Sequence, residues 1–119
     1  MALNEATAHD LSTRLQNREA TARELIQATL DRIDAVDGQI NAYISVDATG
    51  ALAQADAIDQ RRERGEPLGP LAGIPLALKD VLCVRGGRTT CGSRILENYI
   101  APYDATAVAR LRGADAVFV

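Results

Sequence analysis

Apolar residues recur with helical spacing through the first third of the chain. Thr7 precedes a segment in which Leu11 and Leu15 lie one turn apart, and this pattern predicts a capped helix that ends near Arg18. A second helix is expected to follow it, because a pattern typical of a helix start appears again at Thr21.

That second helix is predicted to begin at a capping box, in which the Thr21 side chain reaches forward and the Glu24 side chain reaches back. Asp37-Gly38 is its expected end or the start of the following turn. Its apolar stripe consists of Leu25, Ile26, Leu30 and Ile33.

Alternation with a period of two replaces the helical period over residues 40–46, where apolar and more polar residues take turns. We predict a strand there, closed by Asp47. An alanine-rich segment from about Ala48 to Arg64 predicts a third helix, and Gly65 stands where a left-handed residue would end it. The inward residues of this helix are expected to be Leu52, Ala55 and Ile58.

The end of the third helix carries the run Arg61-Arg62-Glu63-Arg64, which an RNA-binding patch or a solvated helix end would explain. The solvated end is preferred, because positive charge there complements the helix dipole. Glu66–Pro70 forms a short, stiff connector and not a linker between domains. We therefore expect one domain, with residues 1–65 a helical region with one strand and residues 66–119 the start of its core.

Ile74–Leu78 is an apolar run that leads directly into Lys79. Both alternating faces of the run are apolar, which predicts a strand covered on both sides in a parallel sheet. A lysine that emerges from a covered zone loses water, and this would lower its pKa from about 10.4 toward neutrality and make the neutral amine a base. The alternative is an ammonium that reaches water. Asp80 is expected either to hold Lys79 by a hydrogen bond or to cap the strand end.

Shorter elements are predicted after Asp80. Val81–Val84 is expected to be a strand or an extended segment. Ser93 is placed to cap a short helix that reaches Asn98, and Asp104 is placed to cap another helix over residues 105–112.

The order of these elements indicates an α/β fold, in which crossover connections join the strands of a sheet and the first helices pack outside. Val117–Val119 is the last predicted strand, and the chain stops on it without a turn or a polar tail. We expect the 119 residues to be a piece of a longer protein that is cut within its sheet.

Composition agrees with an ordinary globular domain, because 47% of the residues are hydrophobic and 24% are charged. No apolar run approaches the roughly 20 residues that span a bilayer, and the N-terminus lacks the parts of a signal peptide, so we expect a cytoplasmic location without membrane contact. The formal net charge of -3 gives no electrostatic footprint for nucleic acid. Cys83 and Cys91 lack metal-ligand spacing, and His9 lies on a predicted helix, so no metal site is expected.

Two glycine-containing segments have backbones suited to an anion or oxyanion site, namely Gly86-Gly87 and Thr89–Ser93. Ordinary turns explain both segments as well and are preferred. Ser93 is a candidate nucleophile, but it lacks a Gly-x-Ser-x-Gly setting, and a helix cap is the better interpretation.

Several stretches together resemble the amidase signature family. The likeness is dense from about Pro67 to Val119 and looser from Leu3 to Gly65, and within the family it favours the subunits of tRNA-dependent amidotransferases. The resemblance implies the amidase signature fold, a mixed sheet flanked by helices, of which this chain would supply the first strands. The stretches that carry it are Gly73–Asp80, Arg88–Ser93, Ile95–Tyr99 and Pro102–Val108.

The resemblance also implies a mechanism and partners. Family members use a lysine, a bridging serine in a cis peptide and a nucleophilic serine, and the matching lysine here is Lys79. The complete enzyme would release ammonia from glutamine. Its partners would be the B and C subunits of the amidotransferase. The B subunit would use ATP and Mg²⁺ to activate Glu-tRNA(Gln) or Asp-tRNA(Asn), and the C subunit would hold the assembly together. This chain would then bind no cofactor itself and would meet tRNA only through the complex.

Two departures from the family pattern accompany this resemblance. Ser12, Ser45 and Ser93 do not lie in the Gly/Ser-rich setting of the family's catalytic serines, so the chain is expected to lack the nucleophile and to be inactive alone. Gly113–Ala116 differs from the Ala-Gly-Ala usual before the last strand, which leaves the geometry of that turn open. A stand-alone amidase for small amides and a non-catalytic α/β interaction module are the alternative functions.

Overall fold

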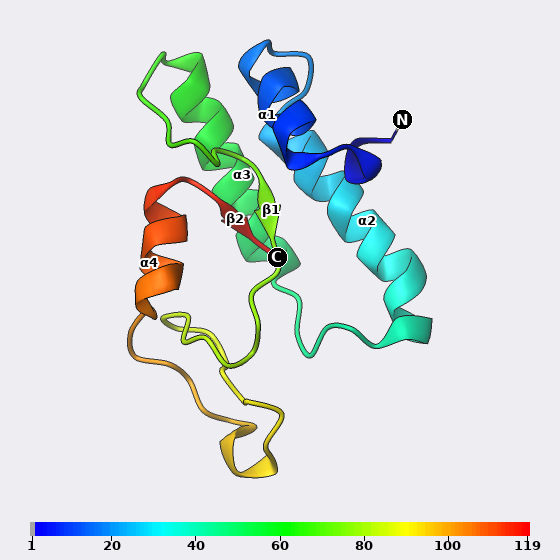
Figure 1. Ribbon diagram of the computed structural model, residues 1–119, viewed down its shortest axis with the longest axis vertical. Coiled ribbons are helices and arrows are strands. Elements are labelled where there is room, and N and C mark those ends of the chain that lie inside the picture. The colour runs from blue at the N-terminus through cyan, green and yellow to red at the C-terminus, as the bar shows by residue number, and fades with distance from the viewer. Residues whose placement is uncertain (1) are drawn as a thin grey trace.

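Helices flank a small parallel sheet in the computed structural model, which describes residues 2–119 (Figure 1). The strands pair side by side with Pro75 opposite Val117 and Leu76 opposite Phe118. In chain order the helices and strands are α1 (Ala8–Gln16), α2 (Ala22–Ile40), α3 (Ala48–Glu63), β1 (Pro75–Leu76), α4 (Thr106–Gly113) and β2 (Val117–Phe118), with short 3-10 helices at Leu3–Glu5 and Arg94–Leu96.

The two strands separate two apolar clusters. Val117 is fully buried against the layer formed by α1, α2 and α3, whereas Phe118 packs with Val108 of α4 on the other side. Successive side chains of a strand point to opposite faces, so two residues of β2 are enough to join both clusters. The molecule therefore has the α/β organisation that the sequence predicts. The largest fully buried side chains are Leu15, Leu25, Ile26, Val108 and Val117.

The first two helices begin where the sequence predicts, with Thr7 capping α1 and a complete capping box at the start of α2. In that box the Thr21 hydroxyl accepts the Glu24 N–H at 3.1 Å, and the Glu24 carboxylate accepts the Thr21 N–H at 2.9 Å. Asp59 of α3 adds a cap that local sequence does not reveal. Its carboxylate accepts the first two backbone N–H groups of α2, at 2.8 and 3.0 Å.

The strand expected over residues 40–46 is a wrong prediction, because the structure has a helix end and a loop there. α2 continues through Gly38, where its stop was predicted, and ends at Ile40 before Asn41 turns the chain with a φ of 55°. A glycine within a helix costs only about 1 kcal/mol, which does not stop a helix that packs along its length. The alternating apolar residues of the loop, Ile44 and Val46, are exposed.

The third helix matches its prediction closely. Asp47 does not close a strand but caps α3, and its carboxylate accepts the Gly50 N–H at 2.9 Å. Gly65 follows the helix with a φ of 69°, as expected. Gly73 then lets the chain approach α2, because a Cβ at this position would lie 2.8 Å from the Cβ of Ala22.

Residues 77–105 contain few regular elements and form the extended lower part of the view in Figure 1. β1 is shorter than the predicted strand, and Val81–Val84 forms turns and coil where a strand or extended segment was expected. Ser93 caps the 3-10 helix, as predicted, and accepts the Ile95 N–H at 3.3 Å. Asp104 does not cap α4, which begins after Ala105 without a side-chain cap.

The outer edge of β2 is occupied by a side chain of α3. The Gln54 amide accepts the Phe118 N–H at 3.2 Å and donates to the Phe118 carbonyl oxygen at 3.5 Å. Both polar groups of that peptide edge are thereby paired, as buried backbone groups generally are.

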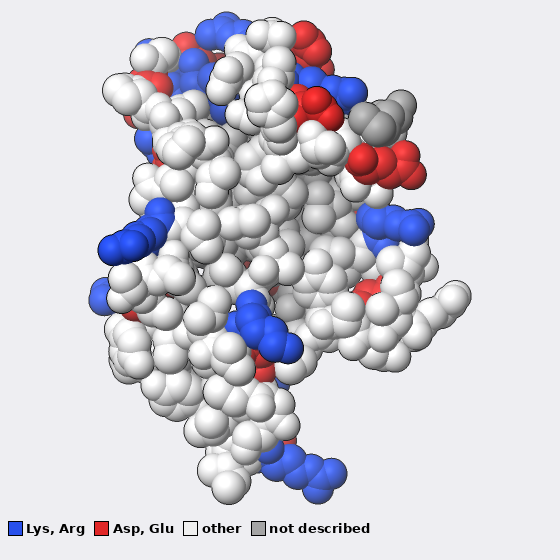
Figure 2. Space-filling view, viewed as in Figure 1, with Lys and Arg blue, Asp and Glu red and all other residues white. Residues whose placement is uncertain are grey.

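The surface shown in Figure 2 carries charges of both signs at its upper end, and its middle is largely free of them. Among residues 2–119, no helix combines the length and the apolar character needed to cross a membrane.

Candidate active site

The residue singled out by the sequence, Lys79, lines a cleft of about 690 Å³. One wall is the loop that follows α2, including Tyr43 and Ser45, and another is the segment that runs from β1 to Arg88. The end of β2 contributes Phe118. The loop predicted to be a strand is therefore a wall of the candidate site.

Lys79 follows β1 closely, but its side chain is exposed in the structure. The covered environment expected for it is thus not provided by the described residues. A different property makes it distinctive: it is the only lysine in the sequence, and every other strongly basic side chain is an arginine. Lys79 is thus the only one of these side chains that carries a compact amine on a flexible stem, whereas the arginines carry a planar guanidinium.

Asp80 does not hold Lys79 through its carboxylate, nor does it simply cap the strand. Three consecutive backbone N–H groups converge on it instead. The carboxylate accepts the Thr90 N–H at 2.9 Å and the Gly92 N–H at 3.4 Å, and the backbone carbonyl of Asp80 accepts the Cys91 N–H at 3.1 Å. The Thr90 hydroxyl also donates to the carboxylate. The hydrogen bond from the Thr90 hydroxyl and, to a lesser extent, the one from the Thr90 N–H hold the pKa of the Asp80 carboxyl below its ordinary value.

This arrangement decides between the two interpretations of Thr89–Ser93. Cys91 and Gly92 have φ values of 51° and 65°, and two successive left-handed residues turn their N–H groups toward one point. The point is already occupied by Asp80, so the segment serves as a structural loop. The Gly86-Gly87 segment is also a turn, since its two N–H groups donate to Ala101 and Val84 carbonyls at 2.8 and 2.9 Å.

Asp104 connects the cleft-lining segment at Arg85 to α4 through hydrogen bonds. Its carboxylate receives the Arg112 guanidinium in two hydrogen bonds, at 3.0 and 3.2 Å, and accepts the Arg85 N–H at 2.8 Å. Arg112, followed by the Arg85 N–H, holds the pKa of the Asp104 carboxyl below its ordinary value. Arg112 also lies over the Phe118 ring, 5.0 Å from its centroid.

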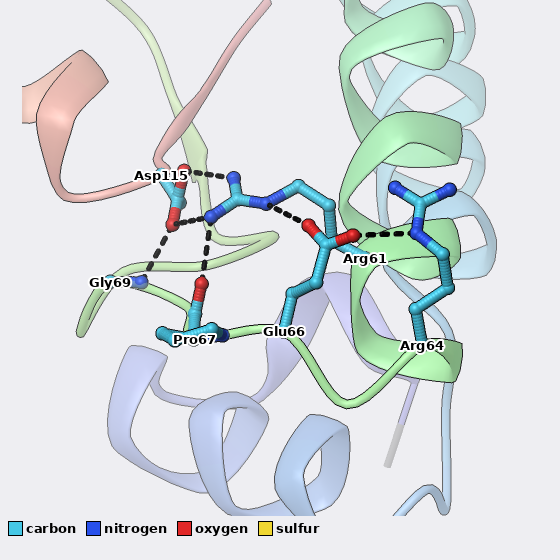
Figure 3. A network of polar contacts seen from close by, with 6 residues as sticks. All are labelled: Arg61, Arg64, Glu66, Pro67, Gly69 and Asp115. Carbon is cyan, nitrogen blue, oxygen red and sulfur yellow. Dashed lines mark hydrogen bonds and ion pairs between the residues drawn. The ribbon is translucent and has the colours of Figure 1, made fainter.

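A second polar network joins the end of α3 to the turn before β2 (Figure 3). Arg61 forms an ion pair with Asp115 at 2.7 Å and donates to the Pro67 carbonyl oxygen at 2.8 Å. Asp115 also accepts the Gly69 N–H at 2.6 Å. Arg61 is thus a structural residue in part shielded from water, whereas the sequence favoured a fully solvated helix end.

The same network explains the unusual turn at Gly113–Ala116. Asp115 takes up a left-handed conformation with a φ of 64°, which aspartate tolerates better than most residues. Burial acts to raise the pKa of its carboxyl, but the hydrogen bonds from Arg61 and Gly69 outweigh it and keep the pKa below its ordinary value. Gly69 is required here, because a Cβ would lie 2.5 Å from the backbone of Ala114.

The remaining candidate residues are dispersed. Ser45 lines the same cleft as Lys79, whereas Ser93 caps the 3-10 helix. Cys83 and Cys91 are free thiols. Within the described part of the chain, no group of three or more His, Cys, Asp and Glu side chains is arranged to hold a metal ion.

Comparison with known proteins connects this cleft to a family. The family model described as Amidase matches residues 24–119, which include both strands and the whole lysine-bearing segment. The chain belongs to the amidase signature family. The solved peptide amidase from Stenotrophomonas maltophilia is similar with a TM-score of 0.90 at 38% identity, over 97% of this chain and 24% of that one. A bacterial aryl acylamidase of the family gives a TM-score of 0.92 at 26% identity, over 100% of this chain and 25% of that one.

Curated relatives in the amidase signature family are more similar in sequence. The A subunit of glutamyl-tRNA(Gln) amidotransferase from Moorella thermoacetica is 52% identical over 119 residues, which are 100% of this chain and 24% of the relative. The corresponding protein of Streptomyces coelicolor is 52% identical over 113 residues, or 95% of this chain and 23% of the relative. The chain therefore spans about a quarter of the length of the curated relatives that it matches.

Proposed function

We propose that this chain forms part of the glutamine-hydrolysing subunit of a tRNA-dependent amidotransferase, with Lys79 as its general base. The observation that carries the proposal is the position of the chain's single lysine just after β1, on the cleft, in an amidase-family sequence. The 52% identity to the A subunits of two amidotransferases supports this substrate class over others in the family.

The proposed role of Lys79 follows from the chemistry of amide cleavage. A serine hydroxyl is a weak nucleophile near neutral pH and needs a base to take its proton. In the proposal, the neutral Lys79 amine takes that proton through a bridging serine while the nucleophilic serine attacks the side-chain amide carbon of glutamine. The proton then passes to the amide nitrogen, which leaves as ammonia, and water releases glutamate. Both serines would come from sequence outside these 119 residues.

The use of the ammonia requires partners in this proposal. The B subunit of the amidotransferase would activate the misacylated Glu-tRNA(Gln) or Asp-tRNA(Asn) with ATP and Mg²⁺ and receive the ammonia, and the C subunit would stabilise the assembly. The chain itself would bind neither ATP nor metal, would contact tRNA only indirectly, and would act in the cytoplasm.

Substitution of the lysine in the complete protein tests this function. Lys79→Ala and Lys79→Arg should each lower glutamine-dependent ammonia release roughly 10³-fold or more, because neither side chain can accept a proton at working pH. Ser12→Ala is the control, since Ser12 lies on α1 and does not line the cleft, so turnover should stay unchanged. Near-normal turnover in Lys79→Arg would reject the general-base role.

The isolated 119-residue chain offers a second test of the proposal. It should release no ammonia from glutamine above background, because a base without its nucleophile forms no acyl intermediate. Turnover that survives repurification and disappears in Ser45→Ala would instead identify Ser45 as a nucleophile and contradict the assignment of the serines to other sequence.

A stand-alone amidase is the second candidate, favoured by the similarity to the peptide amidase at a TM-score of 0.90. Such an enzyme would hydrolyse small amides without partner subunits. Purification of the complete protein from its own cells, followed by turnover measurements on glutamine and on a panel of small amides, separates the two candidates. Activity on the panel without co-purifying subunits would favour the stand-alone enzyme.

A further inference from the structure

Asp80 and the loop that follows Arg88 form the most highly connected polar cluster near the candidate base. Of the residues that the structure describes, Thr89 and Thr90 are the polar ones that are buried, with 3% and 4% of their surface exposed. Thr90 gives both its N–H and its hydroxyl to Asp80. Two buried polar residues of the described part of the chain thus lie next to each other, and one of them binds the residue that follows Lys79.

One further contact closes the turn that carries the lysine, and another joins this turn to the loop. The Leu82 N–H donates to the Lys79 carbonyl oxygen at 2.9 Å, which closes a tight turn. The Thr89 hydroxyl donates to the Leu82 carbonyl oxygen at 3.4 Å, near the limit of a hydrogen bond. Together with the contacts of Asp80, the Thr89 contact attaches the turn to the loop at Asp80 and Leu82.

We propose that Asp80 is a positioning residue for the candidate base: its carboxylate and carbonyl bind three consecutive N–H groups of residues 90–92 and so fix the peptide that orients Lys79. This inference rests on the proposed function, because it gives Asp80 a role through the lysine. Asp80 acts as an internal anion in a loop that would otherwise present its N–H groups to solvent.

The physical argument is one of backbone geometry. The Lys79 side chain is exposed and flexible, so the direction in which it leaves the backbone determines where its amine can reach. The peptide between Lys79 and Asp80 is anchored on the Asp80 side by side-chain and main-chain contacts. The left-handed Cys91, with a φ of 51°, is held in place by the same contacts, as strained conformations require.

The test uses the complete protein and four substitutions at this cluster. Asp80→Asn keeps one acceptor but places a donor against the N–H groups, and Asp80→Ala removes both oxygens. Thr90→Val removes the hydroxyl at nearly constant shape, and Thr90→Ser restores it. Asp56→Asn is the control, because Asp56 forms an exposed ion pair with Arg23 on the helical layer.

Turnover of glutamine and hydrogen exchange of the backbone amide of residue 90, which donates to Asp80 at 2.9 Å, are measured for each variant. Asp80→Asn should lower kcat roughly 10²-fold with KM within about twofold, because misplacement of a base by about 1 Å has an effect of this size. Exchange at the Thr90 amide should accelerate in the same variant, because its acceptor is the Asp80 carboxylate. Thr90→Val should lose kcat more than Thr90→Ser, and added formate should restore part of the activity of Asp80→Ala by filling the vacated position.

Each result decides for or against the positioning role. Faster exchange at the Thr90 amide with an unchanged kcat in Asp80→Asn would overturn it, as would a change confined to KM. Unchanged exchange would show that Asp80 does not hold the loop, and would also overturn it. A series in which Lys79→Ala abolishes turnover but Asp80→Asn does not rejects the inference alone, whereas turnover in Lys79→Ala rejects the proposed function beneath it.

Discussion

The helical region before Gly65 and the loop-rich region after it are stabilised in different ways. α1, α2 and α3 bury Leu15, Leu25 and Ile26 almost completely, and their N-terminal ends are closed by side-chain caps. The later region contains two short strands and an α-helix of eight residues. Carboxylates accept hydrogen bonds from its backbone in the segments that belong to neither a sheet nor a helix. Asp80, Asp104 and Asp115 each accept backbone N–H groups there.

The difference shows how a catalytic segment can be ordered without regular structure. Hydrophobic contacts in an apolar layer have no directional preference, whereas a carboxylate that accepts several N–H groups fixes the backbone at defined points. The candidate base lies in the second kind of region, between β1 and Asp80. We therefore expect the two regions to respond differently to substitution and to pH.

The largest effect is expected from removal of a buried side chain in the helical layer. Ile26→Ala should lower the free energy of unfolding by about 2–5 kcal/mol, since Ile26 is 0% exposed and the substitution leaves a cavity. Ile95→Ala, at a position 94% exposed, should change it by no more than about 0.5 kcal/mol. Urea unfolding of both variants measures the difference, and equal losses would contradict the layered core.

Loss of the Asp115 carboxylate should have the next largest effect. Asp115→Asn should lower the free energy of unfolding by about 1–3 kcal/mol, because the amide cannot accept all the donors that Arg61 and Gly69 direct at the carboxylate. Asp115→Gly separates the two roles of the residue. If accommodation of the φ of 64° were its main role, the glycine variant would be at least as stable as the wild type.

The contribution of the Asp115 carboxylate should also appear in the pH dependence of the free energy of unfolding. The pKa of the Asp115 carboxyl is below its ordinary value in the folded protein, so the unfolded chain binds the proton more readily and stability rises with pH in this range. The contribution is complete above the unfolded pKa of about 3.9 and is lost as pH falls through the lower folded value. Urea midpoints of the wild type and Asp115→Asn should therefore converge in acid. A constant difference at all pH values would contradict this.

The capping box of α2 should contribute less to the free energy of unfolding than the Asp115 carboxylate does. Thr21→Ala should lower the free energy of unfolding by about 1 kcal/mol, because it leaves the Glu24 N–H without its acceptor. Thr13→Ala is a matched control inside α1, where alanine favours the helix and no loss is expected. Thermal unfolding followed by circular dichroism compares them, and a larger loss in Thr13→Ala would refute the capping role.

The smallest effect is expected for an ion pair on the surface of the helical layer. Arg23 and Asp56 have 53% and 43% of their side chains exposed. Asp56→Asn should change the free energy of unfolding by less than about 0.5 kcal/mol, because solvent screens the pair. A loss of stability similar to that of Asp115→Asn would show that solvent exposure does not explain the difference in stabilisation between the Arg23–Asp56 and Arg61–Asp115 ion pairs.

Sequence reasoning succeeded where the determining contacts are local. Thr7, the capping box at Thr21, and Gly65 each act within a few residues of themselves, and all three were predicted correctly. The last strand was also recognised from its own apolar residues. Short-range signals of this kind are complete in the sequence.

It failed where the partner lies far along the chain. Asp115 binds Arg61 across 54 residues, and Asp104 binds the Arg85 N–H across 19 residues, so neither role can be seen in a local pattern. The alternating loop over 41–47 has the pattern of a strand, but a strand exists only where another pairs with it. A strand before Lys79 was predicted, and β1 lies there but is shorter than expected, whereas the exposure of Lys79 depends on what covers it.

The Gln54 amide has a further consequence for self-association. Primary amides and peptide units carry the same donor and acceptor, so this side chain imitates a neighbouring strand along the outer edge of β2. Exposed edges recruit other chains into intermolecular sheets, and proteins commonly block them. Any strand that approached this edge would first have to displace the glutamine. Gln54 therefore blocks backbone pairing at this edge of β2.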